Sequence, residues 1–146
     1  MKESTPARFI VSVVVLHSVI SGLHGLIHQA LVIGLSLAQL NYVLWVTIVA
    51  PAVGVVLFWR GFRTPGAILI LASMIGALVF GIYYHVWATG PDKILTLPQD
   101  GALPSLFQGT AVVLLILEAL GCYVALRYLV GMMRFARPPP SKASLL

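Results

Sequence analysis

Four long apolar runs dominate this sequence and limit what the chain can fold into; they cover residues 9–34, 40–59, 66–87 and 106–130. A helix of about 20 apolar residues crosses the roughly 30 Å hydrocarbon core of a bilayer, and each run reaches that length. Hydrophobic residues make up 60% of the chain and charged residues only 9%, whereas a soluble domain has about 25% charged residues. The sequence therefore predicts an all-α membrane protein in which residues 1–146 form a single domain, an antiparallel bundle of four transmembrane helices.

Length and cysteine content exclude several classes of protein. Four spans and their connections use nearly the whole chain, which leaves no room for a separate soluble catalytic domain. Cys122 is the only cysteine, so an intramolecular disulfide and a paired-cysteine redox centre are impossible. The formal net charge of +5 is explained by cytoplasmic retention and attraction to anionic lipid, so we expect the lipid bilayer as a partner and no nucleic acid.

The basic residues predict how the chain is oriented in the membrane. Only Lys93 falls near one side of the predicted bundle, and the other eight of the nine Lys and Arg residues fall near the opposite side; they are Lys2, Arg8, Arg60, Arg63, Arg127, Arg134, Arg137 and Lys142. Cytoplasmic segments retain positive charge during insertion. We therefore expect both termini, including a tail over residues 131–146, in the cytoplasm, and the protein in a bacterial inner membrane.

Residues 88–105 form the longest predicted non-helical segment, which this orientation places outside. Its glycines and prolines are typical of a loop, but an apolar stretch over residues 94–97 interrupts it. A solvated linker does not need apolar residues. We expect the loop to fold back onto the bundle or to lie in the interface as a lid, with a mobile connector as the alternative.

Prolines mark two irregular places in the predicted helices. Thr64 is expected to cap the third helix, with Pro65 at the first helical position, where a missing N–H costs nothing. Pro51 lies within the second run and leaves the carbonyl of Thr47 without its helical partner. This predicts a kink with polar groups facing inward.

Five ionisable residues fall inside the predicted spans: His17, His24 and His28 in the first, His85 in the third and Glu118 in the fourth. Such residues are costly in hydrocarbon and usually face the interior of a bundle. At about 100° per residue, the three histidines of the first span lie in one narrow stripe. Gly22 and Gly25 flank this stripe, and small residues at such spacing predict a closely packed neighbouring helix.

Depth along the helices predicts two clusters of these residues. At about 1.5 Å per residue, Glu118 lies near the membrane centre, at a level between those of His17 and His24. We expect its carboxyl group to hydrogen-bond with one of them. His28 and His85 both lie roughly 10–13 Å towards the outer side, where they can converge, with His24 one turn below.

The residue type and the spacing of the histidines are typical of a metal site. His24 and His28, one turn apart, can hold one ion jointly, and His85 can supply a third nitrogen. Zinc or copper suits neutral imidazole ligands. Glu118 is a further candidate ligand, with His17 as a secondary polar partner.

Other ligands and another cofactor remain open at this point. Haem b is the alternative to a metal ion, with His28 and His85 as its cofactor-binding axial ligands. Cys122 can add a thiolate, although a lone buried cysteine usually serves packing. Three polar residues near the outer side can complete a metal site: Asp92, Asp100 and Gln29.

These observations support two hypotheses from different classes. The first is a small inner-membrane protein whose intramembrane His/Glu site binds a transition metal or haem in a redox or transfer role. The second is a noncatalytic accessory or scaffold subunit of a larger membrane complex, or of a homo-oligomer, in which the histidines only hydrogen-bond helices together. Neither hypothesis names a reaction.

The division of Lys and Arg leads to a test of topology. With Cys122 replaced by serine, a cysteine introduced at Thr96 is expected to react with a membrane-impermeant thiol reagent added from outside the cell. The reason is that the eight basic residues hold the opposite ends of the helices in the cytoplasm. Labelling from the cytoplasmic side alone would refute the orientation.

Overall fold

The computed structural model of the chain describes residues 5–96 and 101–135, and every regular element in these ranges is a helix. Four helical rods are long and apolar enough to cross a membrane, so the predicted helical class is confirmed. The rods are α1 (Thr5–Ala30), α2 (Leu37–Tyr42) with η1 (Val43–Val49) and α3 (Ala50–Trp59), α4 (Arg63–Gly81) with η2 (Ile82–Trp87), and α5 (Ala102–Phe135). A short turn, η3 (Ile94–Thr96), precedes α5.

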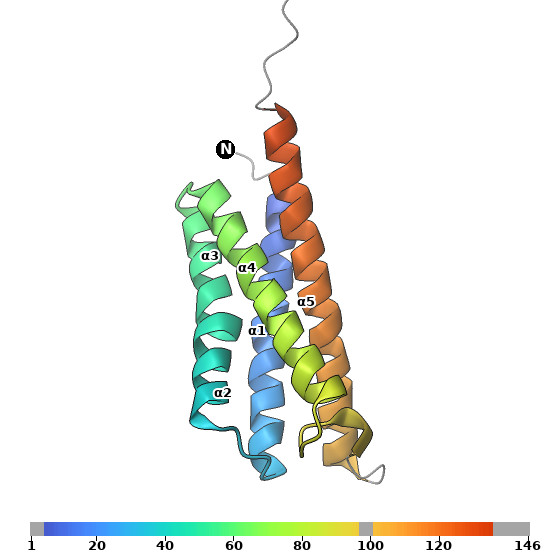
Figure 1. Cartoon of the computed structure of the whole chain (residues 1–146). Coiled ribbons are helices and arrows are strands. Elements are labelled where there is room, and N and C mark those ends of the chain that lie inside the picture. The colour runs from blue at the N-terminus through green and yellow to red at the C-terminus, as the bar shows by residue number, and fades with distance from the viewer. Residues whose placement is uncertain (1–4, 97–100, 136–146) are drawn as a thin grey trace, which may run out of the picture.

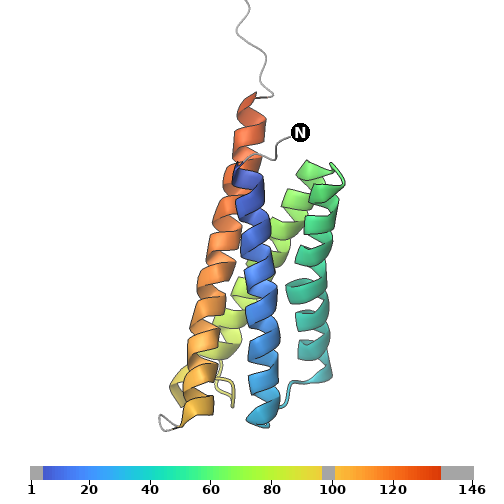
Figure 2. The same ribbon diagram turned by 180° about the vertical axis from the view of Figure 1, so that it is seen from behind.

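Figures 1 and 2 show how the rods are arranged: α5 packs against α1 and α4, and α3 packs against α4. The start of α1, the turn between α3 and α4 and the end of α5 lie at one end of the molecule. We term it the basic end, because Arg8, Arg60 and Arg63 belong to these segments. The opposite end, termed the loop end, carries the connection from α1 to α2 and the described part of the connection to α5.

Apolar side chains cover the outside of the rods. The side chains of Val19, Leu26 and Ile116, from α1 and α5, are all more than half exposed. In water, extended apolar surfaces of this kind are rare except where they bind a partner or a membrane. The exterior of the four rods is therefore consistent with an integral membrane protein surrounded by hydrocarbon.

The first helix ends at Ala30, before the predicted end at residue 34, because of a backbone motif that lacks its usual glycine. The N–H of Ile33 donates to the carbonyl of His28 (2.9 Å) and the N–H of Val32 to the carbonyl of Gln29 (3.0 Å), which are the two bonds of a Schellman motif. Val32 occupies its left-handed position with φ 55°, at a cost of about 1–2 kcal/mol for a residue with a side chain. Ile33 packs near Ile27, the apolar contact that accompanies this motif.

The later helices also begin at residues other than the predicted ones. The expected Thr64 cap is wrong: α4 begins at Arg63 after Phe62, without a side-chain cap, and the Thr64 hydroxyl donates to the Met132 sulfur (3.8 Å). Helix α5 follows Gly101, whose φ of 120° suits glycine alone, and continues to Phe135. The remainder of the predicted tail, residues 136–146, lies outside the described residues.

Two π-helical turns interrupt the second and third rods. The irregularity predicted at Pro51 takes the form of η1, in which the N–H of Ala50 reaches back five residues to the carbonyl of Trp45. The second π turn, η2, contains His85. A π turn widens the helix and rotates the following side chains relative to an α-helix, and such turns are frequent at functional sites.

Apolar side chains fill the interior at the basic end. The residues that form this basic-end core are buried and come from four helices: Ala7, Ile10, Val14, Val55, Phe58, Ala67, Ile70, Met74 and Ala125. Helices α3 and α4 cross closely where Gly54 faces Gly66. At Gly22, by contrast, no described atom beyond its own helix lies within 4 Å of a Cβ position, so the close packing predicted there is wrong.

The crossing of α3 and α4 leads to a test of stability. A Cβ at position 66 would lie 2.7 Å from the carbonyl oxygen of Gly54 and 3.0 Å from the amide nitrogen of Phe58, both rigid backbone atoms. We expect Gly66→Ala to lower the stability by about 1–3 kcal/mol, the usual cost of overpacking. Thermal unfolding of the purified protein in detergent measures it.

Gly22→Ala is the matched control for this substitution. The same added methyl group meets no described neighbour there, so Gly22→Ala should cost no stability and is expected to gain up to about 1 kcal/mol, the difference in helix propensity between Gly and Ala. Equal losses of stability at positions 22 and 66 would contradict the packing of α3 on α4.

Candidate metal centre

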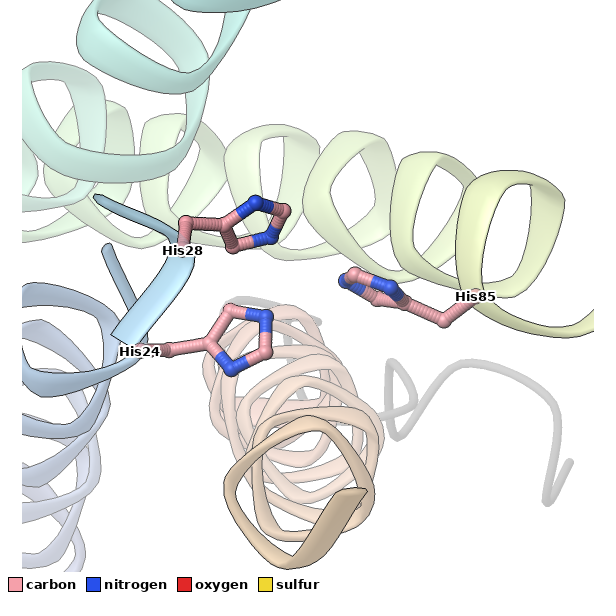
Figure 3. Close-up of side chains that lie close together, drawn as sticks. All are labelled: His24, His28 and His85. Atoms are coloured by element: carbon pink, nitrogen blue, oxygen red, sulfur yellow. The ribbon is translucent and has the colours of Figure 1, made fainter. Parts of the chain in front are cut away.

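Three buried imidazoles converge in the half of the molecule near the loop end. His24 and His28 come from α1 and His85 from η2, and Figure 3 shows the three rings directed towards one shared space. The ring centroid of His24 lies 4.9 Å from that of His28 and 5.1 Å from that of His85. One ligand nitrogen from each residue lies within 4.8 Å of the others.

The local structure explains why these side chains meet. His24 and His28 are four residues apart and therefore lie on the same face of α1. The π turn η2 carries His85 into the bundle beside them. Phe107 of α5 is fully buried and supports all three rings, with centroid distances of 4.6 Å to His24, 4.8 Å to His28 and 5.6 Å to His85.

The partner of His24 determines which of its nitrogens carries hydrogen. The hydroxyl oxygen of Thr110 lies 2.7 Å from the Leu106 carbonyl oxygen and 3.1 Å from the Phe107 carbonyl oxygen, so its one hydrogen is donated to the backbone. The same oxygen lies 2.7 Å from Nδ1 of His24, and it can accept from Nδ1 while it donates to the backbone. This arrangement favours the tautomer of His24 with hydrogen on Nδ1 and a free lone pair on Nε2.

His28 and His85 are held in the same way by backbone carbonyls. Nδ1 of His28 donates to the carbonyl of Ile33 (3.4 Å), and Nδ1 of His85 donates to the carbonyl of Asp92 (2.9 Å). A carbonyl oxygen only accepts hydrogen bonds, so both rings carry hydrogen on Nδ1. In Figure 3 the ring nitrogens farther from the backbone face the shared space, so three Nε2 lone pairs point towards it.

A cavity of about 80 Å³ connects the three histidines with Glu118 and Asp92. A second hollow, of about 310 Å³, lies beside it at the loop end and shares Asp92 with it. The segment that carries Asp92 folds back onto the bundle, since the Gln108 side chain donates to the carbonyl of Ile94 (3.1 Å). Asp92 therefore lies in the wall of both hollows.

Glu118 lies apart from the three imidazoles and is bound to His17. Its Oε1 is 3.3 Å from Nε2 of His17, so the hydrogen bond predicted between Glu118 and either His17 or His24 is present with His17. Glu118 is eight residues beyond Thr110 on α5, about 12 Å at 1.5 Å per residue. The group that can hold a metal comprises His24, His28 and His85 among the described residues, and Glu118, proposed from sequence as a ligand, is not part of it.

Three buried polar atoms have no hydrogen-bond partner within the described part of the chain: Nε2 of His24, Oε2 of Glu118 and Nδ1 of His17. Native proteins pair nearly all such atoms with protein groups, water or an ion. Two of the three residues, His24 and Glu118, line the cavity. The cavity therefore has the properties of a binding site.

The other candidate ligands have different positions. Asp92 lines the cavity, the side of α1 that carries Gln29 is exposed, and Asp100 lies outside the described residues. Cys122 packs against the basic-end core. Sequence reasoning missed Phe107 and Thr110, although their spacing of three residues on an apolar helix places them on one face.

In comparisons with known proteins, no protein family, no curated protein and no solved structure matches this chain. The geometry of the cavity therefore carries the functional argument.

Proposed function

We propose that this integral membrane protein binds one transition-metal ion, zinc or copper, through Nε2 of His24, His28 and His85, in a redox or transfer role. The observation that carries the proposal is the common orientation of the three rings. Each donates Nδ1–H to an oxygen and leaves Nε2 free towards the shared space. Histidines that bind metals are oriented by the same type of outer hydrogen bond.

The size of the cavity favours a single ion over haem. An apolar cavity of about 150 Å³ admits benzene, whereas this cavity has about 80 Å³, too little for the four pyrrole rings of a porphyrin. Nitrogens at about 2.0–2.1 Å from zinc lie about 3.3 Å apart in a tetrahedral site. The ligand nitrogens lie within 4.8 Å of one another, so they need to approach one another by at most about 1.5 Å to reach that separation.

Three protein ligands leave one coordination position free. Catalytic zinc sites have this arrangement, with water or substrate in the fourth position, whereas structural sites usually have four protein ligands. The cavity provides room for such a group beside the histidines. A site of this kind suits exchange or chemistry at the ion better than a purely structural role.

The alternative, an accessory subunit whose histidines only hold helices together, accounts for fewer of the contacts. A packing role explains the bonds of His24, His28 and His85 through Nδ1. It leaves Nε2 of His24 buried without a partner among the described residues, at a cost of about 1–3 kcal/mol. A bound ion removes that cost.

In the membrane, we place the rods as an antiparallel bundle with the basic end in the cytoplasm of a bacterial cell. The positive-inside rule supports this orientation, since Arg8, Arg60 and Arg63 lie at that end. The loop end and the hollow beside Asp92 then face outward. The metal ion reaches its ligands from the outer side.

Metal analysis of the purified protein tests the proposal. We expect about one zinc or copper ion per chain, and loss of most of it in His28→Ala or His85→Ala, because losing one of three ligands breaks the coordination. His17→Gln is the matched control, since His17 is the only other histidine and an amide can still bond to Glu118. It should retain one ion per chain.

Two results would overturn the proposed function. One is an unmodified protein that contains no stoichiometric metal after reconstitution with zinc or copper. The other is equal loss of metal in His17→Gln and His28→Ala, which would indicate unspecific adsorption. In either case the accessory-subunit hypothesis would be preferred.

A second test concerns the hydroxyl that orients His24. Thr110→Val keeps the shape of the side chain but removes the acceptor of Nδ1–H, so we expect the affinity for zinc to fall about 10–100-fold. Thr110→Ser keeps the hydroxyl and should bind zinc like the unmodified protein. Competition with a chelator of known affinity measures both; equal affinities of the Val and Ser variants would show that Thr110 does not orient the ligand.

A further inference from the structure

The hydrogen-bonded pair of His17 and Glu118 is not part of the three-histidine group, but it reaches the same cavity through Glu118. Both side chains are buried, and Glu118 lines the cavity wall. Oε2 of Glu118 and Nδ1 of His17 have no partner among the described residues. The pair borders the basic-end core: Val14, a member of this core, precedes His17 by one turn, and Cys122, which packs against the core, follows Glu118 by one turn.

We propose that the His17–Glu118 pair releases one proton when the metal ion binds, so that the pair becomes negative and compensates part of the charge of the ion. This inference rests on the proposed metal site and adds a proton-coupled step to it. One dication enters the three-histidine site, one proton leaves the pair, and no electron moves. The pair changes from a net charge of zero to −1.

A metal dication in the cavity needs a counter-charge. Three neutral imidazoles do not reduce the charge of a dication, and an uncompensated charge is very costly inside a membrane. Asp92 and Glu118 are the acidic side chains that line the cavity. Asp92 supplies one negative charge at the loop end, so one further negative charge makes the occupied site neutral.

Without metal, the pair of His17 and Glu118 is most stable when it is net neutral. Its 3.3 Å contact needs one shared hydrogen, and a net-neutral pair holds one more proton, on either partner. Burial favours a net-neutral pair here, because the outer atoms of both side chains have no partner in the described part of the chain. A negative pair becomes favourable only when a cation is present in the same cavity.

Other titratable groups near the cavity do not supply this proton. The rod with η1 and the helix α4 contribute only apolar, small and hydroxyl side chains to its wall, among them Val43, Thr47, Ala77, Phe80 and Gly81. The three ligand histidines already present free Nε2 lone pairs. Cys122 lies near Glu118 on α5 but does not belong to the cavity wall.

Calorimetric titration with zinc alone, in neutral buffers of different ionisation enthalpy, counts the protons released per ion bound. We expect the full-length protein in detergent to release about one proton more than Glu118→Gln, because the amide keeps the shape but has no proton to exchange. Glu118→Asp retains a carboxyl group and should restore the release. Cys122→Ser, which removes the nearby thiol, should release as many protons as the unmodified protein.

Equal proton release by the unmodified protein and Glu118→Gln, with zinc bound to both, would overturn the inference and leave the metal site standing. Greater release by Glu118→Gln would also overturn it, because the pair would then take up a proton. If Glu118→Gln fails to fold, the double variant H17Q/E118Q, whose two amides can hydrogen-bond to each other, gives the same comparison. If the unmodified protein binds no zinc, the proposed function and this inference both fail.

Discussion

The structure depends on one constraint: a polar group inside an apolar helix bundle needs a partner, because hydrocarbon offers none. The chain meets this constraint for Nδ1 of His24, His28 and His85, each paired with an oxygen of its own fold. It leaves Nε2 of His24 and Oε2 of Glu118 unpaired by the described residues. Those two residues line a common cavity. The two polar atoms without a partner therefore mark the position of the candidate site.

Irregular backbone supplies the partners that regular helices cannot. The carbonyl of Ile33 is free to accept from His28 because α1 ends in a Schellman motif around Val32. The carbonyl of Asp92 is available because the chain leaves the helix after the π turn of His85. The strained conformation of Val32 is held in place because the next residue, Ile33, packs in one buried apolar cluster with Ile27 and Phe107. The irregular ends of these helices therefore provide the carbonyl groups that orient the imidazoles.

The helical rods and the convergence of the histidines can be predicted from periodicity, which can be read directly from the sequence. Apolar runs predict the spans, and the spacing of His24 and His28 together with the depth of His85 predicts their convergence. The ends of the helices do not follow in this way, because Val32 occupies a position that glycine usually takes. Thr110 was missed because a hydroxyl on a helix usually bonds only to its own backbone, whereas this one also accepts from His24.

The interior of the bundle differs on the two sides of the histidine cavity, and this difference limits the directions in which an ion can move. The histidine cavity lies next to the hollow at the loop end, with Asp92 shared by both. Beyond His17, towards the basic end, the interior is filled by buried apolar residues such as Ile10, Phe58 and Met74. For the proposed ion, the apolar side is a high barrier, whereas the hollow of the loop end lies on the other side. For the proposed ion site, this arrangement favours binding and release on the side of the loop end over conduction across the bilayer.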